Sequence, residues 1–365
     1  MNFFKAIQFC IKNNLNFAAY RLPNTDSITL VIQKHPVPKK VKISEALFSQ
    51  SGFLISPFSE SDSNNSYFIT ADLVYSSTDY DDVNDLKNLD AIPFPEENFE
   101  NGVISRKNFI IQVDEIKKAI AEKKFEKAVI SRIKIIERSY RSKLNEIFQM
   151  LCNSYPNAFV YLFNVANQTW MGATPEPLLC SRQNELMTVS LAGTKEYNAN
   201  NLNLRNWSSK DIVEQELVTK YIENTLAELR IDWLQKKGPY TKKAGNLIHL
   251  RTDFTLDFNQ VNSHIDKLIK ELHPTSAVCG FPKKESMQFI KNLEKHNRKY
   301  YSGFLGPINI DEKVQLFVNL RCMQILCDKL VLHIGAGITI DSVPEDEWDE
   351  TEIKADTLLS VIHKV

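Results

Sequence analysis

Two long strand-like runs that follow one another near the C-terminus constrain the fold more than any other feature of this sequence. Residues 313–326 and 329–335 are both strongly apolar, and only a short polar step at Asp328-Lys329 separates them. Strands joined so closely must pair antiparallel, because a parallel pair needs a crossover of about a dozen residues or more. The sequence therefore predicts an antiparallel hairpin in this part of the chain.

The rest of the pattern mixes strands and helices without a regular alternation. Further strands are expected at 127–136, 158–164 and 186–191, and helices at 113–123, 142–153, 209–229, 262–272, 284–294 and 346–362. The first 75 residues contain short strand-like runs such as SITLVIQK and YFITADLVYS. We therefore predict an α+β fold, with antiparallel β-sheets packed together in a core and helices on the outside.

A stretch rich in Asp, Asn and Pro divides the chain unequally. Residues 76–107 have little apolar content and are interpreted as an irregular acidic connection. We interpret residues 1–105 as an N-terminal part of the same domain that ends in this linker. Residues 106–365 are then the catalytic region, because every candidate site residue lies there.

Composition excludes several classes of partner. The chain has 44 basic and 45 acidic residues, so no basic face for nucleic acid is indicated. No apolar run reaches the roughly 18 residues needed to span a bilayer, and the first residues are too short and too charged for a secretory signal. The six cysteines form no CxxC pair. We expect a cytoplasmic protein with reduced thiols and no membrane contact.

A glycine turn followed by a cluster of acids is the first candidate site. Gly335-Ala336-Gly337 precedes seven acidic residues between Asp341 and Glu352. If a helix begins near Pro344, one stripe is apolar and a neighbouring stripe carries Glu347, Glu350 and Lys354. Acids at a helix start can simply be solvated. Two carboxylates one turn apart with an ammonium could also hold a cation and an anion side by side.

The helix expected at 209–229 supplies a second group of acids. Ser208 and Asp211 have the spacing of a capping box, and Glu214 lies in the apolar stripe. A carboxylate on a buried face needs a cation or a metal ion. A buried salt bridge and a Mg²⁺ site shared with Glu347 and Glu350 both remain open, since Mg²⁺ prefers oxygen ligands.

Four other residues have both a structural and a functional interpretation. Arg321 interrupts an apolar strand, where it could pair with an acid or bind an anionic ligand. Lys127 opens a strand and is either solvated or, if desolvated, a general base. Glu176 follows a proline turn that is unspecific by itself. His273, in a loop dense in Pro and Gly, is either a core histidine or a ligand contact.

Nine stretches together resemble the chorismate-utilising enzyme family, which comprises isochorismate, salicylate, anthranilate and aminodeoxychorismate synthases. They occur in the family's order between about residues 120 and 362: KAVISR, GATPEPLL, SLAGTKEY, SSKDIVEQELV, LHPTSAVCGFP, RKYYSGFLG, FVNLRCMQI, HIGAGIT and DEWDETEIK. The first 105 residues show little specific match.

The resemblance implies what the candidate site residues bind. It implies a Mg²⁺ ion held by acids of two helices, here Glu214 and Glu350 with Asp211 and Glu347 close by. It also implies chorismate as substrate, with its carboxylates bound by side chains and by backbone amides of the glycine turn. The matching substrate-binding positions are Thr194, Tyr301, Arg321, Gly335, Gly337 and Lys354.

Two positions distinguish branches of the family. Lys127 matches the lysine that activates water in isochorismate and salicylate synthases, where amine-transferring members usually have glutamine. Ala192 replaces a nucleophilic lysine common in aminodeoxychorismate synthases. The resemblance therefore implies an isochorismate synthase with Lys127 as base, Glu176 as acid and His273 beside the ring. It also implies a monomer without a glutaminase subunit. A salicylate synthase and a catalytically silent chorismate-fold binding protein are the alternatives.

Overall fold

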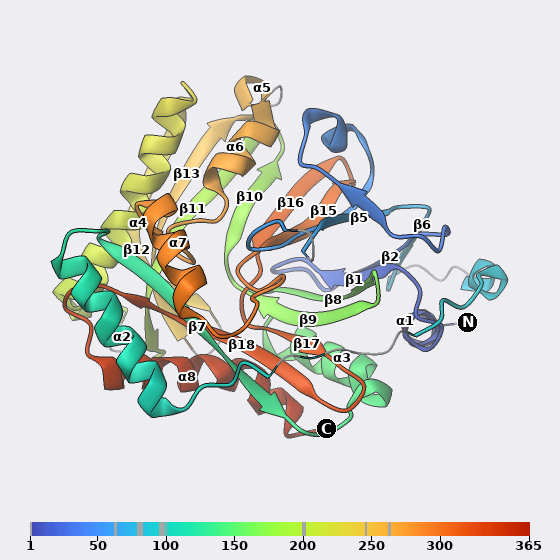
Figure 1. Cartoon of the computed structure of the whole chain (residues 1–365). Helices are drawn as coiled ribbons and strands as arrows, with labels where there is room; N and C mark the ends of the chain where they lie inside the picture. The colour runs from blue at the N-terminus through green and yellow to red at the C-terminus, as the bar shows by residue number, and fades with distance from the viewer. Residues whose placement is uncertain are drawn as a thin grey trace.

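In the computed structural model, two antiparallel sheets pack together and helices cover their outer faces (Figure 1). This is the fold class predicted from the sequence. The structure describes residues 2–61, 64–78, 83–94, 99, 101–198, 202–244, 247–261 and 264–365. Every strand pairing recorded in these residues is antiparallel, as a chain of hairpins and short connections requires.

Each sheet has nine described strands. In spatial order, the first sheet consists of β14 (Gly280–Phe281), β7 (Lys127–Ile136), β18 (Leu330–Ile338), β17 (Cys322–Ile325), β9 (Gln168–Thr174), β8 (Phe159–Val165), β1 (Phe17–Arg21), β2 (Ile28–Ile32) and β6 (Leu73–Ser76). The second consists of β12 (Trp233–Ala244), β13 (Leu247–Asp257), β11 (Glu185–Glu196), β10 (Pro177–Arg182), β16 (Lys313–Val318), β15 (Phe304–Ile310), β4 (Gly52–Ser56), β5 (Ser66–Thr70) and β3 (Lys39–Val41).

The helices have the bounds α1 (Phe3–Lys12), α2 (Arg106–Ala121), α3 (Leu144–Ser154), α4 (Ser209–Glu228), α5 (Phe258–Val261), α6 (Ile265–Leu272), α7 (Lys283–Leu293) and α8 (Pro344–Ile362). Helix α4 packs on β11 of the second sheet, and α8 packs on β18 of the first (Figure 1). The capping box predicted at the start of α4 is confirmed, since Ser208 and Asp211 bond each other's backbone N–H groups. Among the described residues no helix is both long and apolar enough to cross a bilayer.

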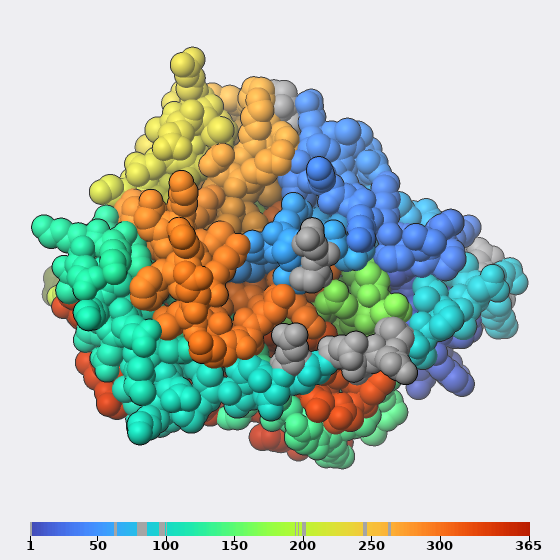
Figure 2. All heavy atoms as spheres, viewed as in Figure 1, coloured from blue at the N-terminus to red at the C-terminus, as the bar shows by residue number. Residues whose placement is uncertain are grey.

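The N-terminal strands are integral to both sheets. Strand β1 pairs with β8 in the first sheet, and β4 pairs with β15 in the second. In the space-filling view the blue N-terminal segment lies next to the orange segment of α6 and α7 on the same face (Figure 2). Part of the acidic stretch predicted as an irregular connection lies outside the described residues. Its described part includes one short 3₁₀ helix, η2 (Val83–Asn88).

The single strand predicted at 313–326 is wrong, and the error concerns the site directly. The run is two strands, β16 in the second sheet and β17 in the first. The chain crosses between the sheets at 319–321, where Arg321 has φ 48°, a left-handed conformation that a continuous strand does not allow. The predicted hairpin at Asp328-Lys329 is confirmed, but it joins β17 to β18. Arg321 therefore lies at a crossing, not on one face of a long strand.

Aromatic side chains from both sheets form the core between them. Phe159 of the first sheet and Phe317 of the second stack with ring centroids 4.2 Å apart and planes 3° from parallel. Phe53 and Tyr161 also pack on Phe159. All of these rings are buried, so this stack fixes the separation of the sheets.

Replacing Phe159 with alanine should therefore destabilise the protein strongly. A buried Phe→Ala change typically costs about 3–5 kcal/mol, because it leaves a cavity that the rigid sheets cannot close. Urea unfolding at equilibrium measures this loss. The matched control is Leu234→Ala, at a side chain that is 61% exposed, where a change within about 0.5 kcal/mol is expected. Equal losses in both variants would contradict this account of the core.

Candidate active site

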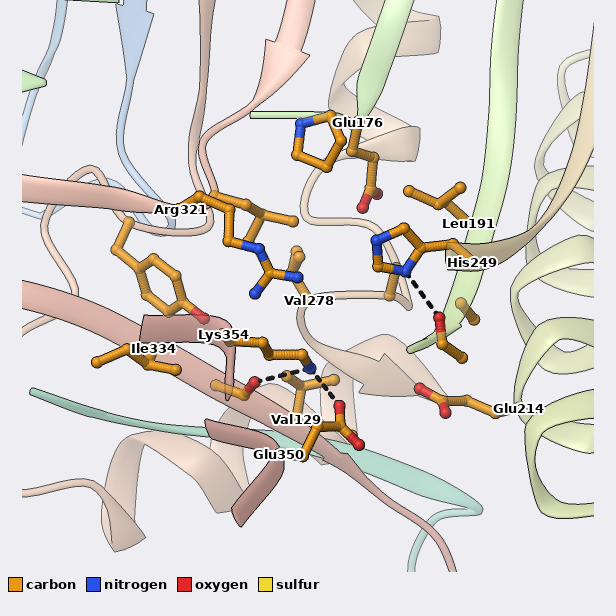
Figure 3. Close-up of a pocket in the computed structure, with 18 of the residues that line it drawn as sticks. Val129, Glu176, Leu191, Glu214, His249, Val278, Arg321, Ile334, Glu350 and Lys354 are labelled. Carbon is orange, nitrogen blue, oxygen red and sulfur yellow. Dashed lines mark hydrogen bonds and ion pairs between the residues drawn. The ribbon is translucent and has the colours of Figure 1, made fainter. Parts of the chain in front are cut away.

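A cavity lies where the two sheets meet helices α4 and α8. It holds about 700 Å³ of empty space, including the part open to solvent. Its walls come from β7, β11, β13 and β18, from the loops after β9 and β16, and from both helices (Figure 3). The residues predicted from the sequence that line it are Glu176, Glu214, Tyr301, Arg321, Gly335, Gly337, Glu350 and Lys354.

Lys127 lies next to this cavity, at the first position of β7. Its side chain is fully buried, and its Nζ is 2.9 Å from Oε1 of Glu214. Gly337 makes room for this contact, since a Cβ there would lie 2.5 Å from the same oxygen and 3.1 Å from Cε of Lys127. Burial would raise the pKa of Glu214, but nearby lysines, Lys127 foremost, outweigh it and lower that pKa. Lys127 is thus a desolvated lysine and not a solvated residue at a strand end.

Glu176 is the second buried ionisable group of the site. It follows β9 and is 4% exposed. Burial raises the pKa of Glu176 to about 8, against the opposing positive charges of Lys127, Arg321, Arg251 and Lys354. Its carboxyl group points into the cavity beside His249 (Figure 3). At neutral pH Glu176 is therefore mostly protonated and can donate a proton.

Arg321 and Tyr301 form a cationic, hydrogen-bonding end of the cavity. The Arg321 guanidinium points inward and has no hydrogen-bond or ion-pair partner within the described chain (Figure 3). Burial raises the pKa of Tyr301 to about 12, which keeps its hydroxyl protonated as a donor. Gly335 leaves space for this hydroxyl, because a Cβ there would lie 2.6 Å from it. A half-buried guanidinium that is unpaired among the described residues is suited to bind a carboxylate ligand.

Helix α8 brings acids and a lysine to the cavity wall beside the glycine turn. Glu350 forms an ion pair with Lys354, whose Nζ also donates to the Gly335 carbonyl over 3.1 Å. Glu347, one turn earlier, has a side chain that is 1% exposed and pairs with Lys210 of α4. Burial and the charge of Glu350 raise the pKa of Glu347. The predicted stripe of Glu347, Glu350 and Lys354 therefore faces α4 and the glycine turn.

Two predicted site residues, Asp211 and His273, lie away from the cavity. The Asp211 carboxylate accepts hydrogen bonds from Ser208 and lies 3.3 Å from Lys195, so it serves as a helix cap. The Nε2 of His273 lies 2.9 Å from the carbonyl of Pro57, and its ring does not line the cavity. We leave Asp211 and His273 out of the functional set. The side chain of Thr194 lies outside the described part of the structure.

His249 of β13 lines the cavity, although the sequence pattern did not single it out. Its Nδ1 lies 2.8 Å from the Gly193 carbonyl, which can only accept, so Nδ1 carries the proton and Nε2 is the acceptor. Burial lowers the pKa of His249 to about 3, and the ring is therefore neutral. The run LIHLRTDF, with polar side chains at alternate positions, is the signal that could have revealed this strand.

His333 is a second lining histidine without a predicted role. It is 4% exposed and stacks on Tyr301 with ring centroids 5.6 Å apart. Neither ring nitrogen has a hydrogen-bond partner among the described residues. Burial holds the pKa of His333 well below its usual range. The ring is therefore a neutral neighbour of Tyr301 at the edge of the cavity.

The acids of α4 and α8 fit a Mg²⁺ ion by their chemistry. Glu214 and Glu350 face the same cavity from opposite sides (Figure 3), and Oε2 of buried Glu347 has no hydrogen-bond partner among the described residues. Mg²⁺ commonly takes one or two carboxylates and completes its shell with water and substrate oxygens. No three His, Cys, Asp or Glu side chains of the described chain already converge on one point. A cation here would be held by few protein ligands.

Comparison with known proteins identifies the family of this chain. A family model described as chorismate binding enzyme matches residues 4–363. Isochorismate synthase MenF of Bacillus subtilis is 26% identical over 250 residues, which are 67% of this chain and 53% of that protein. The vibriobactin-specific isochorismate synthase of Vibrio cholerae is 27% identical over 242 residues, which are 64% of this chain and 61% of that protein. The chain spans little more than half the length of these curated relatives.

Solved structures show the same fold. The structure of MenF, the menaquinone-specific isochorismate synthase from Escherichia coli, superposes with a TM-score of 0.77 at 19% identity, covering 98% of this chain and 91% of that one. Anthranilate synthases also occur among the similar sequences and structures. Because the family model covers almost the whole chain, this protein belongs to the family of chorismate-binding enzymes.

Proposed function

We propose that this protein is an isochorismate synthase, which converts chorismate to isochorismate with Mg²⁺ as cofactor. One observation carries the proposal: a protonated buried carboxyl, Glu176, lines the cavity, and a buried lysine, Lys127, lies beside it in contact with the lining residue Glu214. Its relatives include enzymes named for menaquinone and for vibriobactin formation, and the proposal concerns the reaction that they share.

The two buried groups match the two proton transfers of the reaction. Lys127, in its amine form, accepts a proton from water as the water oxygen bonds to C2 of the ring. The ring double bonds shift, and the C4–O bond breaks. Glu176 gives its proton to the departing hydroxyl, which leaves as water. One water enters and one leaves, so the product is an isomer of the substrate.

The walls of the cavity supply substrate binding. Arg321 and the Tyr301 hydroxyl can both donate to one carboxylate of chorismate, which carries two. Neutral His249 offers Nε2 as an acceptor near Glu176. Glu214, Glu350 and Glu347 would hold Mg²⁺, which would bind the other carboxylate and stabilise charge that develops on it. Because water is the nucleophile in this proposal, no glutaminase partner is needed to supply ammonia.

Product analysis tests the proposal. The protein is incubated with chorismate and MgCl₂, and the products are separated by liquid chromatography. Isochorismate is expected, and excess EDTA should abolish its formation. Anthranilate on addition of ammonium, or turnover that survives the chelator, would overturn the proposal. Salicylate with pyruvate would identify the salicylate synthase reaction instead.

Arg321→Ala should mainly weaken chorismate binding. A charge-assisted hydrogen bond to a carboxylate contributes about 1.5–3 kcal/mol. The free energy of chorismate binding should weaken by roughly that amount, which appears as a higher KM, while kcat changes less. Folding should not suffer, because this guanidinium has no partner in the described protein. The matched control is Arg132→Ala, which removes contacts to Thr351 and Glu352 outside the cavity and should lower stability. An unchanged KM in Arg321→Ala with an intact fold would show that Arg321 does not bind substrate.

A further inference from the structure

Each acid of the proposed metal site is held by its own lysine. The three lysines come from three different elements, so the pairing is not a feature of one helix. The pairs are Glu214 with Lys127 of β7, Glu347 with Lys210 of α4, and Glu350 with Lys354 of α8. Three negative and three positive charges thus meet beside the cavity and cancel.

Burial explains why these acids need lysines in the metal-free protein. The side chains of Lys127 and Glu347 are 0% and 1% exposed, and that of Glu214 is 14% exposed. A buried carboxylate without a cation is costly, and removal of one partner of such a pair leaves an uncompensated charge. The lysines are therefore the counter-ions that allow three carboxylates to lie together before any metal is present.

The same carboxylate oxygens are those that a metal ion needs. Oε1 of Glu214 is in contact with Lys127 and also lies against Gly337 on the cavity wall. An ammonium and a divalent cation cannot share this position, because both would lie within about 4 Å of each other and repel strongly. Either the metal avoids Glu214 or Lys127 moves away from it.

We propose that these three lysines are exchangeable counter-ions, which hold the metal-site acids in the free protein and are displaced as a divalent cation binds. Lys127 is the central case. Its Nζ lies 2.9 Å from Oε1 of Glu214, so it occupies an oxygen that the cation would need. Entry of the cation takes Glu214 and moves Lys127 away from it. This inference rests on the proposed function, because it concerns the acids of the same metal site.

Metal titration without substrate tests the exchange. The affinity of the protein for Mg²⁺ is measured by isothermal titration calorimetry, and for Mn²⁺ by electron paramagnetic resonance. Lys127→Met removes the competing ammonium and should tighten binding at least about tenfold, since a unit charge a few ångströms away interacts strongly even at an effective dielectric constant of 20. Lys127→Arg keeps the charge and should not tighten it.

Lys134→Met is the matched control. Lys134 lies on the same strand as Lys127 and pairs with an acid of α8, Glu352, over 2.6 Å, but neither residue lines the cavity. Its loss should leave metal affinity within about twofold of wild type, because exposed pairs are largely screened. Lys210→Met provides a second test variant, since its side chain is 24% exposed and its removal disturbs the core less.

Thermal unfolding gives an independent readout. Lys127→Met should melt lower than wild type in EDTA and should gain more from added Mg²⁺, because its Glu214 has no lysine partner until the metal arrives. Unchanged or weaker metal binding in both Lys127→Met and Lys210→Met would overturn the exchange. These measurements use no chorismate. If the protein forms isochorismate but shows no exchange, the inference fails and the proposed function stands. If it shows the exchange but forms no isochorismate, the proposed function fails and the exchange stands.

Discussion

Lys127→Ala should bind chorismate but lose the addition of water, with kcat reduced about 10²–10⁴-fold, the usual effect of removing one general acid or base. The side chain is fully buried beside the cavity and lies next to Gly337, which lines it. Steady-state kinetics with chromatographic detection of isochorismate measures the loss. KM should change little, because Lys127 is not among the residues that bind the carboxylates.

The control for this variant is Lys134→Ala, on the same strand and also paired with an acid. It should retain nearly all activity, since neither Lys134 nor its partner Glu352 lines the cavity. If Lys127→Ala keeps more than about a tenth of wild-type turnover, which is well outside the usual range for a general base, the water-activating role is wrong.

Glu176→Gln should also bind chorismate and should block loss of the 4-hydroxyl, again by about 10²–10⁴-fold in kcat. Glutamine keeps the shape of the protonated acid but has no proton to give. Because burial raises the pKa of Glu176 to about 8, the wild-type kcat/KM, which reports ionisation of the free enzyme, should fall as pH rises through that value. The residual rate of Glu176→Gln should lack this alkaline limb. A variant that keeps both the rate and the limb would remove Glu176 from the mechanism.

The raised pKa of Glu176 also makes the free energy of unfolding fall as pH rises. The contribution of Glu176 to folding is fully present below its unfolded pKa of about 4.3, and it is lost progressively as pH rises from there to about 8. Glu176→Gln carries no ionisable group at this position. It should therefore gain stability relative to wild type as pH rises from about 4.3 to about 8, with a constant difference above that range, as measured by urea unfolding at several pH values. Parallel stability curves for the two proteins would contradict the buried, protonated state.

The helical half of the site could be predicted from the sequence because helix periodicity is a local signal. The spacing of apolar residues placed Glu214 on the inner side of α4, and the stripe on α8 placed Glu350 and Lys354 together. The structure brings these residues to one cavity. Their shared location could not follow from periodicity alone, since it depends on how two sheets position two helices far apart in the chain.

The part of the site that the β-sheets and their connections supply was predicted less well, for a physical reason. Strand patterning reports that a run is buried but not which sheet it joins, so β16 and β17 looked like one strand. The break at Arg321 is a left-handed residue that is not glycine, which leaves no sequence signal. His249 was missed because β12 and β13 are partly polar strands, and His273 was included although its ring bonds the Pro57 carbonyl.

The central claim is that water attacks the chorismate ring in this cavity, and one labelling experiment tests it most directly. The reaction is run with chorismate and MgCl₂ in water enriched in oxygen-18, and isochorismate is analysed by mass spectrometry with fragmentation. The account predicts one heavy oxygen in the product, located in the C2 hydroxyl group. Isochorismate without the label, formed by internal transfer of the 4-hydroxyl, would contradict the assignment of Lys127 and Glu176 as base and acid.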